Sequence, residues 1–178
     1  MLFKNRFPKL QEITSVYAVN VVILYSFSIL FSLQDATRNW ILYLGIEDIL
    51  AIFTYIIFGA FLESLLITSF FIFVYILLPR SIVQGRFVLY GTILTIAFLL
   101  ALMLRSDTSA RISNTLRDNN MVFSFFAATT LILALVAEWS KNIRSAIETF
   151  ADRCMIFLYI YMPISLLSAI GIVARNIR

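Results

Sequence analysis

Five long apolar stretches follow one another along the chain, and short segments rich in polar and charged residues separate them. The stretches are Ile13–Leu33, Ile49–Leu78, Phe87–Leu104, Met121–Ala137 and Met155–Ala174. Their lengths are near or above the roughly 17–25 residues that a helix needs to cross a bilayer. A membrane β-barrel would show short alternating segments instead. The pattern predicts an all-α, polytopic integral membrane protein: a single domain, residues 1–178, built as a bundle of about five transmembrane helices.

The stretch Ile49–Leu78 is the longest of the five. As a helix it would measure about 45 Å, against a hydrocarbon core of about 30 Å. We therefore expect this helix to tilt, protrude from the membrane or break, with Gly59 as a possible weak point.

Residues Glu138–Arg153 show a different pattern, in which apolar residues recur at helical spacing and charged residues fill the other face. The apolar positions are Trp139, Ile143, Ala146, Ile147 and Phe150. Arg144 and Glu148 are spaced to form an ion pair one helical turn apart. We expect an amphipathic segment, 138–153, that lies at the membrane interface or extends a helix into solvent.

The composition agrees with a membrane protein. The chain is 61% hydrophobic and 13% charged, whereas a soluble domain is about half apolar and a quarter charged. The net charge of +4 comes from Lys and Arg residues that flank the apolar stretches, where they would contact lipid headgroups rather than nucleic acid. Their distribution favours a cytoplasmic N-terminus in a cell or inner membrane.

The residues needed for much of metal and nucleophile chemistry are absent. The chain has no histidine and a single cysteine, Cys154. This excludes histidine-ligated haem, copper and zinc, catalytic triads with an imidazole base, and thiolate clusters. Phosphate-binding glycine loops, dinucleotide-binding motifs and nucleophile elbows are also missing. We therefore expect a protein that is not an enzyme, with no catalytic residue, metal site or cofactor.

Glu63 is the one formal charge inside the five apolar stretches. Burial at bilayer depth disfavours an ionised carboxylate, so this residue needs a specific reason. Gly59 and Ala60 lie one turn away on the same face and would let a neighbouring helix approach the carboxyl group. Since no Lys or Arg occurs in the other stretches, the expected partners are hydroxyls, amides and backbone carbonyls. The candidates are Asn20, Thr95, Ser124, Thr129, Thr130, Tyr161 and Ser165.

Small residues at four-residue spacing predict close helix contacts. The pairs are Gly91 with Thr95, Ala97 with Ala101, and Ser165 with Ala169. Such pairs let two backbones approach, and a polar residue such as Asn20 can add a hydrogen bond between helices.

Two functions remain open from the sequence. The first is a non-catalytic membrane subunit that supports the assembly or stability of a larger membrane complex or a homo-oligomer, with Glu63 in a helix contact. The second is a small proton- or cation-coupled carrier or channel that uses Glu63 as an intramembrane relay. Both place the chain in a lipid bilayer, and the first adds a membrane-protein partner or a second copy.

Overall fold

The computed structural model describes residues 7–35, 40–77, 86–107 and 119–177. All the regular elements in these ranges are helices. They are α1 (Leu10–Asp35), α2 (Ile41–Tyr43), α3 (Ile46–Leu77), α5 (Phe87–Asp107), α6 (Asn119–Trp139) and α7 (Lys141–Asn176). The predicted all-α fold class is therefore confirmed for the described part of the chain. The expected end of the second apolar stretch, at Leu78, lies outside it.

Three of the helices, α1, α3 and α7, are long and apolar enough to cross a bilayer. The apolar portions of the other two long helices, Phe87–Ala101 in α5 and Ser124–Trp139 in α6, are shorter. The structure thus supports a membrane protein with three candidate spans, and the crossing of α5 and α6 stays a prediction.

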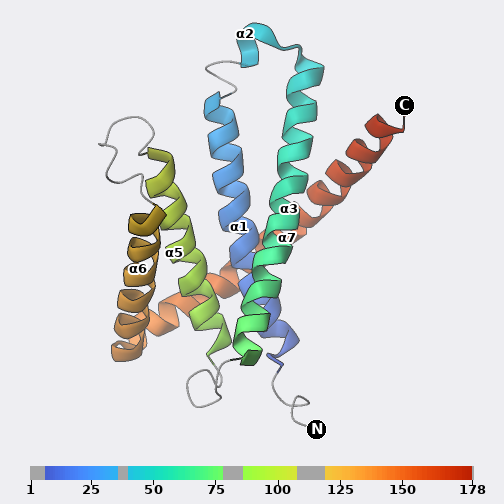
Figure 1. The fold of residues 1–178 in the computed structure, drawn as a ribbon. Helices are drawn as coiled ribbons and strands as arrows, with labels where there is room; N and C mark the ends of the chain where they lie inside the picture. Colours follow the sequence, from blue (N-terminus) through green and yellow to red (C-terminus); the bar gives the residue numbers. More distant parts are fainter. Residues whose placement is uncertain (1–6, 36–39, 78–85, 108–118, 178) are drawn as a thin grey trace.

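Helix α1 occupies the centre of the bundle, because α3, α5 and α7 all pack against it. Helices α1 and α3 run antiparallel, and α5 and α6 form a second antiparallel pair beside them (Figure 1). Helix α7 begins next to the end of α6 and runs obliquely past α1 and α3 (Figure 1). Successive long helices from α1 to α6 therefore run in alternating directions.

The amphipathic segment belongs mainly to α7. The helical structure is interrupted at Ser140, whose extended backbone (φ −115°, ψ 108°) separates α6 from α7. From there one helix of 36 residues includes most of the segment and the fifth apolar stretch, and it continues through Pro163. Its length is about 54 Å, more than a perpendicular crossing requires. The amphipathic residues thus extend the last helix.

Small residues set the distances between α1 and its neighbours. Ala18 and Val19 of α1 form a buried cluster with Ala151 and Cys154 of α7. On the α5 side, a Cβ atom placed on Gly91 would lie 2.8 Å from both γ-carbons of Val16. That separation is below any ordinary carbon–carbon contact, so glycine is required for α5 to approach α1 this closely.

We predict that Gly91→Ala destabilises the protein by about 1–3 kcal/mol, the usual effect of overpacking a close-packed contact. Val16 is β-branched and cannot easily rotate away within its helix. The free energy of unfolding in mixed detergent micelles, followed by circular dichroism, measures the effect.

Gly59 provides the matched control, since a Cβ there would meet nothing within 4 Å. Gly59→Ala should stabilise the isolated chain by about 0.5–1 kcal/mol, because alanine loses less backbone entropy in a helix. Adding Val16→Ala to Gly91→Ala should restore part of the lost stability. Equal effects of alanine at the two glycines would contradict the close approach at Gly91.

Candidate intramembrane polar site

The buried polar site of the bundle is centred on Asn20, whose side chain is fully inaccessible. Its Nδ2 atom donates a hydrogen bond to Thr68 Oγ1 of α3 at 2.8 Å. On the other side, Thr95 Oγ1 of α5 donates to Asn20 Oδ1 at 2.5 Å. One amide on the central helix thereby connects three helices. Both threonines are also buried, so the connection lies within the protein and away from lipid.

Each threonine is held in place by its own helix. Thr68 Oγ1 donates to the Ser64 carbonyl oxygen at 2.8 Å and still accepts the proton from Asn20. Thr95 Oγ1 lies 2.8 Å from the Gly91 carbonyl oxygen, so its single proton is shared between that carbonyl and Asn20. Bonds from threonine to the carbonyl one turn earlier are a common way to satisfy its hydroxyl in a helix. The site is therefore preorganised.

A second polar contact joins α1 to α7. The hydroxyl groups of Tyr25 and Ser165 are hydrogen-bonded to each other, and Ser165 Oγ also donates to the Tyr161 carbonyl oxygen at 2.6 Å. The rings of Tyr25 and Tyr161 lie 4.7 Å apart between centroids. Ser165 is buried while Ala169, its partner in the expected small-residue pair, is only partly so. Asn20 of α1 thus contacts both α3 and α5, and Tyr25 of α1 contacts α7.

Glu63 does not take part in either contact. It lies on the exposed face of α3, and no hydrogen bond or ion pair connects it to another residue in the described ranges. Its neighbours one and two turns further along, Leu66 and Phe70, are 70% and 61% exposed. The carboxyl group therefore points out of the bundle.

Gly59 and Ala60, which were expected to share a face with Glu63, lie on two different faces of α3. Ala60 is buried and packs with Tyr17, Val21 and Tyr25 in the contact with α1. Gly59, in contrast, has open space around its Cβ direction. The helix that approaches Ala60 is thus α1, whereas Gly59 is left uncovered by the described residues.

The contacts among the candidate polar residues differ from those expected from the sequence. Asn20 and Thr95, both expected to be partners of Glu63, instead contact one another. Thr68 was missed, although Ser64 and Thr68 form a polar pair at four-residue spacing that marks the inner face of α3. Ala97 is fully buried in α5, nearly two helical turns beyond Gly91.

Ion pairs occur at the ends of the helices, where they are partly exposed. Arg86 and Tyr90, at the start of α5, both contact the Glu138 carboxylate near the end of α6. Arg175 of α7 lies 3.8 Å from Asp48 of α3. Exposed pairs of this kind contribute little to stability. Among the described residues, no group of three or more His, Cys, Asp or Glu side chains is placed to hold a metal ion.

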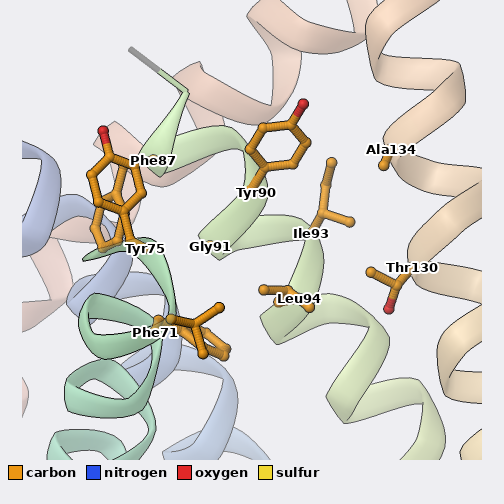
Figure 2. A pocket seen from close by; sticks show the side chains of 10 residues that line it. Phe71, Tyr75, Phe87, Tyr90, Gly91, Ile93, Leu94, Thr130 and Ala134 are labelled. Carbon is orange, nitrogen blue, oxygen red and sulfur yellow. The ribbon is translucent and has the colours of Figure 1, made fainter. Parts of the chain in front are cut away.

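A groove of about 180 Å³ lies between α3, α5 and α6 (Figure 2). Phe71, Tyr75 and Phe87 line one side, and Thr130 and Ala134 of α6 face them across α5. The Thr130 hydroxyl donates to its own helix, at the Phe126 carbonyl oxygen. The lining is thus nearly all apolar, and it suits lipid chains better than a polar ligand.

Comparisons of the chain with protein-family models, with curated proteins and with solved structures found no match. Within the described structure, the inward-facing Asn20 contrasts with the outward-facing Glu63.

We predict that Asn20→Leu lowers the free energy of unfolding and that this loss is coupled to Thr68. A double-mutant cycle with Thr68→Val should give a coupling energy between about 0.6 and 1.7 kcal/mol, the average and the maximum for hydrogen bonds between transmembrane helices. Unfolding in mixed micelles provides the four free energies.

Thr92 supplies the control for removal of a buried hydroxyl from a neighbouring position. Its Oγ1 is buried and has no hydrogen-bonding partner within the described part of the chain. Thr92→Val should therefore be neutral or stabilising, since it removes an unsatisfied polar group. A coupling energy near zero between Asn20 and Thr68 would show that the polar site contributes no interhelical bond.

Proposed function

We propose that the protein is a non-catalytic, multi-span membrane subunit that associates with another membrane protein through the outward face of α3. The observation that carries this proposal is the position of Glu63 on an exposed face of a long apolar helix. An ionisable group facing lipid at this depth costs about 2.5–3.5 kcal/mol on insertion scales. A partner helix that covers the carboxyl group removes that cost.

The proposal includes five membrane crossings. Helices α5 and α6 have 21 residues each, which corresponds to about 31 Å and is close to the hydrocarbon thickness of about 30 Å. The alternating directions of α1, α3, α5 and α6 (Figure 1) support crossings by α5 and α6 as well as by the three longer helices. The excess of Lys and Arg on alternate connections supports a cytoplasmic N-terminus in a cell or inner membrane.

The interior of the bundle argues for a supporting subunit over a carrier. Its central polar group, Asn20, is already bonded to Thr68 and Thr95. A relay through Glu63 would need further polar groups leading from it into the protein, and its neighbours on the outward face are Leu66 and Phe70. Exposed apolar residues alone would only indicate lipid contact, so the proposal of a protein contact rests on Glu63.

We predict that Glu63→Leu and Gly59→Leu each reduce recovery of the chain in an assembly larger than the monomer. The first removes the polar contact, and the second fills the open space beside it. Native mass analysis after purification in mild detergent, repeated over a range of protein concentrations, measures the distribution of assemblies. Either substitution should lower the association constant at least about fivefold if the contact contributes about 1 kcal/mol or more.

Two control variants test whether the effect belongs to this face. Ala128 is exposed on α6, so Ala128→Leu adds bulk on a different helix. Glu47 is exposed in the first turn of α3, so Glu47→Leu removes a carboxylate from the same helix far from Glu63. Both should leave the assembly intact. Recovery of the wild-type chain only as a monomer would overturn the proposal. Proton- or cation-coupled transport in vesicles that Glu63→Gln abolishes would favour the carrier instead.

A further inference from the structure

We infer that the partner subunit presents a lysine or arginine from one of its own transmembrane helices at the depth of Glu63. This inference rests on the proposed function and specifies the chemistry of the partner. It starts from the position of Glu63 along α3, which runs from Ile46 to Leu77. The carboxyl group is about 25 Å from the first residue of the helix and about 21 Å from the last, measured along its axis.

This depth keeps the carboxylate from the lipid headgroups. Long Lys and Arg side chains reach the interface from within a membrane, but glutamate has only two methylene groups. Ionisable residues at such depth pair with one another or face a watery cavity. The described residues around Glu63 provide neither, because the exposed positions that follow it on this face are Leu66 and Phe70.

The apolar stretches of the chain offer no cation at this depth. None of the five apolar stretches contains Lys or Arg. Arg86 and Arg144 are already paired with Glu138 and Glu148 near helix ends. A second copy packed at the same level would bring two carboxylates together rather than a carboxylate and a cation. Charge complementarity therefore selects a different protein, with a basic residue inside a membrane span.

The surface beside Glu63 is shaped to receive such a helix. Gly59 lies one turn away, with nothing within 4 Å of its Cβ direction. A helix backbone can approach closely over a glycine, and this shortens the distance that a Lys or Arg side chain must bridge. Beyond Glu63, Leu66 and Phe70 continue the same exposed stripe and would cover the partner's apolar residues. The contact thus excludes lipid around the ion pair.

A defined probe tests the inference without knowledge of the natural partner. The probe is a synthetic, leucine-rich transmembrane helix with one central lysine, and its matched versions carry leucine or glutamate at that position. Energy transfer between the labelled full chain and each labelled helix in lipid vesicles measures association. The lysine helix should bind the wild-type chain at least about tenfold more tightly than the leucine helix, since desolvated charge pairs contribute more than 1.4 kcal/mol.

Substitutions at Glu63 separate an ion pair from a neutral hydrogen bond. Glutamine keeps the shape and can hydrogen-bond but cannot ionise, so Glu63→Gln should lose the preference for the lysine helix. Glu63→Lys should reverse it and prefer the glutamate helix. Glu47→Gln, in the first turn of α3, should change nothing. Equal binding of the lysine and leucine helices by the wild-type chain, or an unchanged preference in Glu63→Gln, would overturn the inference.

The native assembly distinguishes failure of this inference from failure of the proposed function. An assembly that survives Glu63→Gln but is lost with Glu63→Leu would support the subunit proposal. It would overturn the ion pair, because the partner would then contact Glu63 through a neutral hydrogen bond. An assembly lost with both variants, alongside a lysine preference in vesicles, supports the ion pair. A chain that is monomeric in its own membrane would refute the subunit, whatever the probe helices show.

Discussion

The need to satisfy polar groups away from water governs this bundle. In lipid the helices gain little from burying apolar side chains against one another, so packing and interhelical hydrogen bonds must hold them together. Asn20 meets this need at the centre, because a single amide offers a donor to Thr68 on α3 and an acceptor to Thr95 on α5. The full burial of this amide agrees with the central place of α1.

Close packing around α1 depends on small residues near Asn20. Gly91 lets α5 approach Val16, which brings Thr95, one turn further on, within reach of Asn20. Ala18 and Val19 allow α7 to cross at Ala151 and Cys154. Hydrogen bonds and small residues thus act together: a bond between helices forms only where the backbones are near, and the polar bond in turn fixes which faces meet.

Asn20 and Glu63 show how one requirement leads to two roles. The inward-facing amide is satisfied within the chain and contributes to its fold. The outward-facing carboxyl group has no such partner among the described residues, and this difference is the basis for proposing an interaction with another membrane protein. The open space at Gly59 lies next to the unsatisfied group, whereas Ala60, one residue on, is used inside the fold.

The sequence by itself determined the helical fold class and indicated the membrane environment, because the length and hydropathy of the apolar stretches match the bilayer. It also singled out Asn20, Thr95 and Glu63 by their polarity. Only the tertiary structure decided which of them meet. Residues on a helix share a face by spacing, but hydropathy is nearly uniform around these helices, so no amphipathic stripe distinguished the inner face of α3 from its outer face. Packing against α1 turned Ser64 and Thr68 inward, and that rotation left Glu63 facing out.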